Sequence, residues 1–146
     1  MKKINELLKE RFRGFLPVIV DIETSGIDPE RCALLEICAV LIEIDSNGYF
    51  YPGAYFFEHV LPFEGALLDE KCLAFNQIDP FQPLRFAVEE KTALTQLFLP
   101  IRQAIKKHHC QRAVLVGHNA WFDLLFMKSA VQRCGLNSPF HAFTSF

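Results

Sequence analysis

The residues best suited to chemistry begin in the stretch VIVDIETSG, residues 18–26, where two acids stand two residues apart. The apolar lead-in predicts a buried strand, so side chains alternate between its faces and Asp21 and Glu23 share one face. Carboxylates about 7 Å apart along a strand repel each other unless a cation lies between them. Mg²⁺ prefers such oxygen ligands. The pair therefore predicts a metal site, and the alternative is a solvated strand end with two surface acids.

A second motif with an acid is GHNAWFD, residues 117–123. It follows a short apolar run that predicts a buried strand, and it opens a helix whose first turn contains Asp123. α/β proteins place ligands at this carboxyl edge of the sheet. A third carboxylate there would complete a cradle for two metals roughly 4 Å apart, the arrangement of phosphodiester hydrolysis. The alternative is that Asp123 only stabilises a helix N-terminus, and we interpret His118 and Asn119 as the helix lead-in and cap.

The elements that must position these acids follow from residue periodicity. The predicted strands are 17–23, 34–45, 49–60 and 113–117. The predicted helices are an N-terminal turn or two, a short helix near 70–75, and the segments 88–107 and 120–133. Pro100 predicts a kink, because its ring displaces the carbonyl of Gln96. The order βββ-α-β-α predicts an α/β fold, a mixed sheet of three antiparallel strands and a further strand between helices.

Composition sets the size and class of the chain. Its 146 residues, half of them hydrophobic, predict a single globular domain, 1–146. A net charge of −2 does not by itself indicate a nucleic-acid binder. Five cysteines without a CxxC spacing indicate free thiols in a reducing cytoplasm, and no apolar run is long enough to span a membrane. The 15 Phe leave a few beyond the core for exposed stacking surfaces.

Several motifs together resemble the ribonuclease T family, a branch of the DnaQ-like (DEDD) 3′→5′ exonucleases with a ribonuclease H-like fold. These motifs are RFRGFLPVIV, DIETSG, LAFNQIDP, HNAWFD and SPFHAF. The resemblance runs from about Arg11 to the last residue. RFRGF, LAFNQIDP and SPFHAF favour this branch over polymerase proofreading subunits and oligoribonuclease.

The resemblance implies a reaction and its catalytic acids. Asp21 and Glu23 would be direct ligands of two Mg²⁺ ions, for which Mn²⁺ can substitute, and Asp123 would be a third site acid acting through water. Metal-assisted attack of hydroxide on the last phosphodiester would release 5′-mononucleotides from the 3′ end. The implied substrates are the 3′ ends of tRNA and other stable RNAs, and single-stranded DNA. The implied assembly is a homodimer.

The resemblance also implies how substrate is held. Phe75, Phe122 and Phe143 match the family's base-stacking positions, and stacking contributes roughly 1–3 kcal/mol per base without reading sequence. A basic patch that holds the RNA of the partner's substrate in the dimer is matched by Arg11, Arg13, Lys106 and Arg112. For any one of these residues alone, the alternatives are core packing of a phenylalanine and solvation of a helix end.

Two substrate positions depart from the family pattern. Ile27 stands where an aromatic stacker is expected, and Lys71 stands where an acid is expected, with Glu70 beside it. A branched aliphatic side chain cannot stack as phenylalanine does. We therefore expect an altered or weakened preference among terminal bases.

The family's third motif, HxAxxD, supplies a general-base histidine and a fourth metal-binding acid, and it does not occur before Phe146. None of the five histidines replaces it by motif. We expect the sequence to be part of a longer polypeptide with little activity of its own. We also expect it to lack the final strand and helix of the fold, which would leave strand 113–117 as an open sheet edge.

Two readings from other classes stay open on the sequence. One is a catalytically silent module that binds single-stranded 3′ ends through its phenylalanines and basic patch. The other is a purely structural α/β domain, which would show no salt-dependent binding to single-stranded RNA. Metal binding that disappears in Asp21→Asn would indicate a retained metal site.

Overall fold

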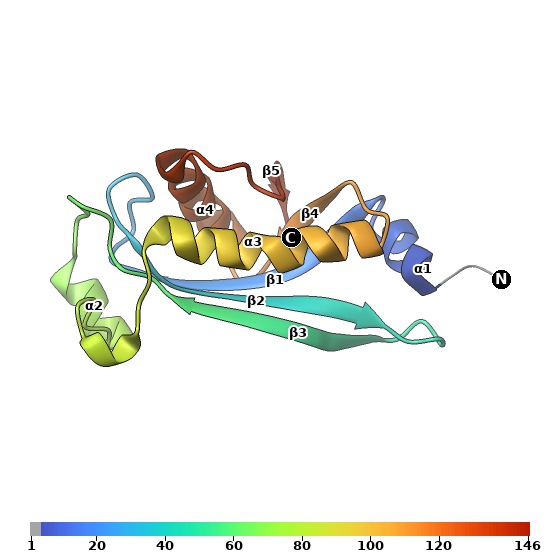
Figure 1. The fold of residues 1–146 in the computed structure, drawn as a ribbon, viewed down its shortest axis with the longest axis horizontal. Helices are drawn as coiled ribbons and strands as arrows, with labels where there is room; N and C mark the ends of the chain where they lie inside the picture. Colours follow the sequence, from blue (N-terminus) through green and yellow to red (C-terminus); the bar gives the residue numbers. More distant parts are fainter. Residues whose placement is uncertain (1–3) are drawn as a thin grey trace.

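A five-stranded mixed sheet forms the centre of the protein in this computed structural model, which describes residues 4–146, with side chains from Leu8 onward (Figure 1). Its strands are β1 (Phe15–Thr24), β2 (Leu34–Ile44), β3 (Phe50–His59), β4 (Arg112–Val116) and β5 (Phe140–Ser145). They lie in the order β3-β2-β1-β4-β5. β1 pairs antiparallel with β2, and β2 pairs antiparallel with β3. β4 lies parallel to β1 and β5 parallel to β4, so the predicted α/β fold with a mixed sheet is confirmed.

The strand β5 corrects two expectations. The final strand is present, and the segment 113–117 is not an open edge, because β5 pairs with β4 through Ala113↔Phe140 and Leu115↔Ser145. The Phe146 amide donates to the Leu115 carbonyl at 2.8 Å. Little in the sequence indicates this strand, because an edge strand needs few apolar residues, and only Phe140 of β5 is buried. Among the described residues, no helix follows β5.

Helices α3 (Glu90–Lys107) and α4 (Ala120–Cys134) cover one face of the sheet (Figure 1). Helix α2 (Glu70–Asn76) lies at one end of the sheet and α1 (Ile4–Arg11) at the other, and a 3-10 turn η1 (Pro83–Arg85) comes between α2 and α3 in the chain. The connections β3-α3-β4 and β4-α4-β5 both step across the sheet in the same direction. Since parallel crossovers are right-handed, this places α3 and α4 on the same face, as Figure 1 shows. No helix in the part of the chain that the structure describes is long and apolar enough to cross a membrane.

The core lies between this helical layer and the sheet. Alternate residues of β1, from Leu16 to Ile22, pack against the apolar face of α3. That face is the predicted one and contains Leu94, Leu97, Phe98 and Ile101. α3 continues through Pro100 to Lys107, so the proline does not end the helix.

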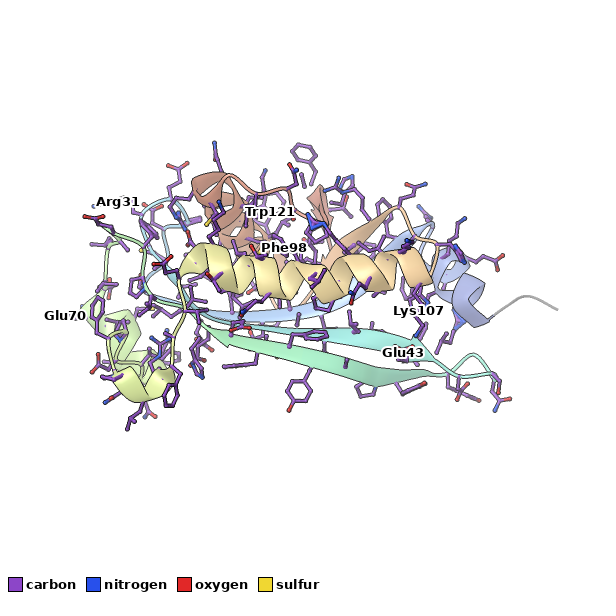
Figure 2. The ribbon with its side chains drawn as sticks, viewed as in Figure 1. Arg31, Glu43, Glu70, Phe98, Lys107 and Trp121 are labelled. Atoms are coloured by element: carbon purple, nitrogen blue, oxygen red, sulfur yellow. The ribbon has the colours of Figure 1, made fainter. Side chains whose placement is uncertain are left out.

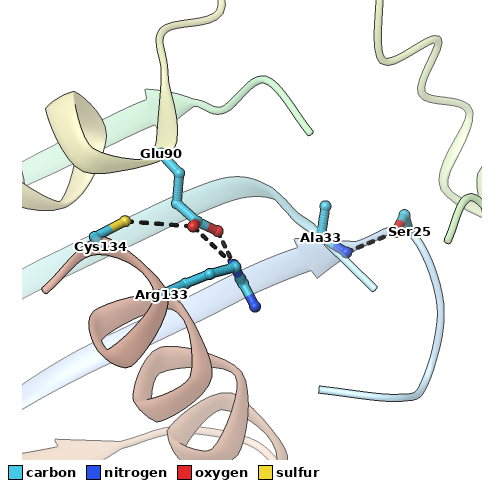
Figure 3. Close-up of polar contacts among 5 residues, drawn as sticks. All are labelled: Ser25, Ala33, Glu90, Arg133 and Cys134. Atoms are coloured by element: carbon cyan, nitrogen blue, oxygen red, sulfur yellow. Dashed lines mark hydrogen bonds and ion pairs between the residues drawn. The ribbon is translucent and has the colours of Figure 1, made fainter. Parts of the chain in front are cut away.

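An ion pair between the buried Glu90 and the half-buried Arg133 joins the start of α3 to the end of α4 (Figure 3). Arg133 donates from Nε and Nη2 to the two carboxylate oxygens of Glu90, at 3.0 and 2.7 Å. The guanidinium also lies 3.8 Å from the centre of the Phe63 ring. The Cys134 thiol donates to the same carboxylate at 3.3 Å, and burial together with this acid raises the pKa of Cys134 to about 11. This cluster, Glu90–Arg133–Cys134, fixes the two helices relative to each other.

Candidate active site

The strand β1 holds the first two acids. Val20 and Ile22 point into the core, so Asp21 and Glu23 lie on the opposite face, as predicted. β1 pairs with β2 up to an irregularity in the register after Glu23. This pairing keeps the backbone at both acids extended. The pair is therefore positioned by the central strand of the sheet.

Asp123 reaches β1 because β4 is short. β4 pairs with β1 only as far as Ile19, and this leaves the edge of β1 beyond that residue open to the start of α4. Asp123 lies in the first turn of α4 and is only 4% exposed. Its side chain hydrogen-bonds to the backbone at Ile22. The third acid is thus brought to the strand that carries the other two.

Gly117 permits this close approach. A Cβ placed on it would lie 2.7 Å from the Val20 carbonyl oxygen and 3.6 Å from Asp123 Oδ2. The first distance is too short for a real side chain, so any other residue would push α4 away from β1. The structure corrects one detail of this motif: Asn119 has a left-handed backbone (φ 53°) and its side chain makes no cap hydrogen bond. The turn into α4 is made by the backbone of Asn119.

The three acids act on one another electrostatically. Burial, with the charges of Asp21 and Glu23, raises the pKa of Asp123 to about 7, although backbone hydrogen bonds oppose the rise. Burial followed by the charges of Asp21 and Glu36 also raises the pKa of Glu23. Such shifts arise when like charges share a poorly solvated site.

Glu36 is a member of this cluster that the sequence reasoning did not single out. It stands directly across from Glu23 in the β1–β2 register and across from His59 in the β2–β3 register. Its carboxylate lies 3.3 Å from the Nδ1 of His59. The strand alternation in LLEICAV could have placed Glu36 on the acid face, but only the register shows that it meets Glu23.

The donor set suits a hard divalent cation. Asp21, Glu23 and Asp123 offer only carboxylate oxygens, and a bound cation would relieve the repulsion that raises their pKa values. Within residues 4–146, no group of three or more His, Cys, Asp and Glu side chains is close enough to form a ready-made metal cluster. Asp21, Glu23 and Asp123 are the residues of this site whose oxygens could hold such an ion.

Comparison with known proteins decides the family. The family model of the RNase_T exonucleases matches residues 18–144. Ribonuclease T of Marinobacter nauticus is 50% identical over 140 residues, which are 95% of this chain and 63% of that protein. The chain belongs to the ribonuclease T family of exonucleases.

Other relatives agree with this ribonuclease T assignment. Ribonuclease T of Vibrio campbellii is 50% identical over 141 residues, or 95% of this chain and 66% of that protein. The chain thus spans slightly less than two thirds of the length of these curated relatives. A crystal structure of Escherichia coli exonuclease I with a dT13 oligonucleotide has a TM-score of 0.66 at 17% identity, over 90% of this chain and 27% of that chain. This likeness shows the shared, ribonuclease H-like fold.

The turn after the acids is fixed by hydrogen bonds. Ser25 Oγ accepts from the Ala33 amide at 2.8 Å (Figure 3). The same hydroxyl donates to the Leu67 carbonyl at 2.6 Å. The Thr24 carbonyl accepts from Asn76 Nδ2 at 2.9 Å, which attaches α2 to the end of β1. These contacts place α2, from the ribonuclease T motif LAFNQIDP, beside the acids.

The three predicted stacking residues differ in exposure. Phe75 on α2 is 89% exposed, so both faces of its ring are open to a base. Phe143 on β5 is also exposed, and the Lys128 ammonium lies 5.0 Å from the centre of its ring. Phe122 is half-buried against Phe126, with ring centres 4.8 Å apart, so part of its surface belongs to the core.

The two departures from the ribonuclease T pattern are both on the surface. Ile27 follows β1 and is 86% exposed. Lys71 is exposed on α2, four residues before Phe75. Both side chains are therefore free to contact a strand bound beside the acids.

The predicted basic residues lie at the opposite end of the sheet from the acids. Arg112 starts β4 opposite Phe15, the first residue of β1, whereas the acids follow near the end of β1. In Figure 2 Glu70 of α2 lies at one end of the molecule and Lys107, next to Lys106, towards the other. The predicted basic patch and the acids therefore lie at different ends of β1.

Two of the basic residues already have partners within the chain. Arg112 donates to the Ser138 and Phe140 carbonyls at 2.6 and 2.8 Å, which holds the turn into β5. The Arg11 guanidinium lies 5.0 Å from the centre of the Phe50 ring. Arg13 and Lys106 are exposed.

The raised pKa of Asp123 makes stability depend on pH. Its pKa rises from 3.8 to about 7 on folding, so between these values the folded state binds more protons than the unfolded state. Stability therefore falls as pH rises from about 4 to 7, by about 2–4 kcal/mol, and then levels. Without divalent cations, Asp123→Asn should remove most of this slope and melt higher than the unchanged protein at pH 8.

Thermal melts at pH 5, 6, 7 and 8 in EDTA measure this effect. Adding Mg²⁺ should raise the melting temperature of the unchanged protein at pH 8 more than that of Asp123→Asn, since a ligand stabilises only the state that binds it. Equal pH slopes in the two proteins would contradict the assigned pKa.

Proposed function

We propose that residues 1–146 are the part of a metal-dependent 3′→5′ exonuclease that binds the metal ions and the 3′ end. Its substrates are the 3′ ends of tRNA and other stable RNAs, and single-stranded DNA, from which it releases 5′-mononucleotides. The observation that carries this proposal is the position of Asp123, which is held against β1 and has a pKa raised first by its burial and then by the charges of Asp21 and Glu23. Membership of the ribonuclease T family supports the activity and the RNA substrates. The oligonucleotide in the exonuclease I complex supports binding of single-stranded DNA.

Each acid has a distinct task in this proposal. Asp21 and Glu23 would hold two Mg²⁺ ions, for which Mn²⁺ could substitute, and Asp123 would be the third acid of the metal site. A bound pair of metals would stabilise the charge on the attacking and leaving oxygens of the phosphodiester. Glu36 acts on Glu23 across the strand pair and keeps the negative potential of the site high until metal binds.

The aromatic side chains grip the 3′ end. Phe75 and Phe143 present open rings on which bases can stack, and Phe122 offers the part of its ring outside the core. Ile27 replaces one stacking surface by an aliphatic contact, and Lys71 brings a cation where the family has an acid. Together these two changes would weaken discrimination among terminal bases.

The HxAxxD motif is not among the 146 residues, so they do not themselves supply the general base and fourth acid of that motif. Loss of a general base alone lowers a rate by roughly 10²–10⁴-fold, so residues 1–146 alone should have little activity. A cytoplasmic homodimer is proposed as the working form, with Arg11, Arg13, Lys106 and Arg112 holding the RNA of the partner's substrate.

The experiment uses the complete protein that contains this sequence. The substrate is a 5′-labelled RNA with a duplex stem and a single-stranded 3′ tail. In Mg²⁺ or Mn²⁺ the tail should be shortened one nucleotide at a time from its 3′ end, with release of 5′-mononucleotides. In EDTA it should stay intact. Products that bear a 3′-phosphate would contradict the proposal. Binding of the strand without shortening, in the complete protein, would favour the silent binding module instead.

A further inference from the structure

Residues 70–88, from the start of α2 to the bridge between Val88 and Val60, form a lobe at the end of the sheet that carries the acids (Figure 1). We call it the α2–η1 lobe. Asn76 of α2 donates to the Thr24 carbonyl at 2.9 Å. Arg85 of η1 donates to the Leu35 carbonyl at 2.7 Å and to the Pro80 carbonyl at 2.8 Å. Since Thr24 pairs with Leu34, both halves of the lobe are anchored to adjacent points on β1 and β2, next to Glu23 and Glu36.

The lobe exposes an unusual amount of apolar surface. Phe81 is 65% exposed, Leu84 76% and Phe86 81%, and all three follow Phe75 within eleven residues. Large apolar side chains that gather on an exposed surface mark binding sites more often than isolated ones do. Core packing does not explain these three, because most of each side chain contacts solvent.

The backbone at Phe86 is held in a conformation that disfavours its side chain. Its φ is 51° and its ψ 40°, the left-handed region that favours glycine. The turn is fixed by the hydrogen bond from its amide to the Pro83 carbonyl and by the bond from the Val88 amide to the His59 carbonyl. A bulky aromatic residue in this position gains little from packing and would be better replaced by glycine for stability alone.

From these observations we infer that Phe81, Leu84 and Phe86 bind unstacked bases of a single strand, upstream of the nucleotide that lies at the acids. This inference rests on the proposed function and extends its substrate site. Aromatic rings stack bases of any sequence. The lobe is continuous with Phe75 and shares its anchor on the sheet, so a strand whose 3′ end lies at Asp21 and Glu23 can continue over it.

The charges of the α2–η1 lobe indicate whether it contacts the bases or the phosphates of a bound strand. Glu70 and Lys71 offset each other on α2, Asp79 accepts from the Phe81 amide, and the Arg85 guanidinium is occupied by two carbonyls. The lobe thus has no excess of cations with which to bind phosphates. Its contribution to affinity should depend on the bases and change little with salt concentration, unlike that of basic residues.

The protein test combines stability with binding. Affinity is measured by fluorescence anisotropy of a 5′-labelled oligouridylate decamer with the complete protein in EDTA, so that the strand stays intact. Phe86→Gly should weaken binding about 5-fold or more, while its melting temperature stays equal or rises by about 2–4 °C because the strained backbone is relieved. Phe81→Ser and Leu84→Ser should also weaken binding. The matched control Leu99→Ser removes a similarly exposed side chain from α3 and should leave binding unchanged.

A second test leaves the protein unaltered. Abasic sites placed two to five nucleotides from the 3′ end should weaken binding to the unchanged protein, and no loss at these positions would overturn the inference. The loss should be similar at 50 and 200 mM salt. This arm decides the inference even if a lobe variant folds poorly.

The outcomes separate the inference from the function on which it rests. If the unchanged protein does not bind the decamer in EDTA, the inference is overturned, whereas the proposed function is decided separately by the shortening assay with Mg²⁺ or Mn²⁺. If it binds and Phe75→Ala weakens binding while the three lobe variants do not, only the inference is overturned. Lobe variants that change the sedimentation coefficient of the protein but not its affinity for the decamer would also overturn it, and would indicate a protein partner instead.

Discussion

Replacing Asp21 with asparagine is expected to lower the rate of mononucleotide release by the complete protein at least about 10²-fold. Metal ions contribute several kcal/mol of charge stabilisation to phosphodiester hydrolysis, and each 1.4 kcal/mol corresponds to a factor of ten. The charge of Asp21 contributes to the raised pKa of both Glu23 and Asp123. Its removal should therefore weaken metal binding and relieve the repulsion within the site at the same time.

Three measurements test this expectation. Product release is followed by chromatography, Mn²⁺ binding by calorimetry, and the titration of the Asp123 carboxyl by NMR in EDTA. In Asp21→Asn the rate and the metal affinity should fall, whereas the pKa of Asp123 should move down from about 7. The last readout would not change if Asp21 were only a solvated surface acid.

A matched control is available on the loop after β1. Glu30→Gln removes an exposed acid from the turn that follows the site, and it should leave rate, metal affinity and titration unchanged. Full activity in Asp21→Asn would exclude the mechanism proposed above.

Replacing Arg133 with methionine is expected to lower the free energy of unfolding by about 3–5 kcal/mol. The substitution leaves the Glu90 carboxylate, 7% exposed, without its two charged hydrogen bonds. The loss of free energy is this large because the Glu90 carboxylate stays poorly solvated and no longer has an opposite charge beside it. The contact of the guanidinium with the Phe63 ring is lost as well.

Urea unfolding at pH 7 measures this loss. The double variant Glu90→Gln/Arg133→Met should recover a substantial part of the stability, since it removes the unpaired charge. Lys91→Met, which removes an exposed cation next to Glu90, serves as the control and should change stability by less than about 0.5 kcal/mol. A loss below about 1 kcal/mol in Arg133→Met would mean that the cluster does not fix α3 to α4.

Secondary structure that buries a long apolar pattern was predictable. β1, α3 and α4 agree with the segments 17–23, 88–107 and 120–133 within a few residues, because each buries a repeating set of apolar side chains. β5 was missed for the converse reason: an edge strand contacts the core mainly through one residue, Phe140, and its pairing with β4 leaves almost no trace in the local sequence. The left-handed backbone conformation of Asn119 was also not predicted, because it depends on the turn through which α4 approaches β1.

The sequence by itself determined that Asp21 and Glu23 share a face of a strand, because side-chain alternation is a local property of extended backbone. It also determined the family, through motifs that are each contiguous in the chain. Only the tertiary structure decided that β4 stops at Ile19 and admits Asp123 to β1, that Glu36 opposes Glu23, and that the basic residues lie at the far end of the sheet. These are consequences of strand register and strand length, which depend on pairing between segments distant in sequence.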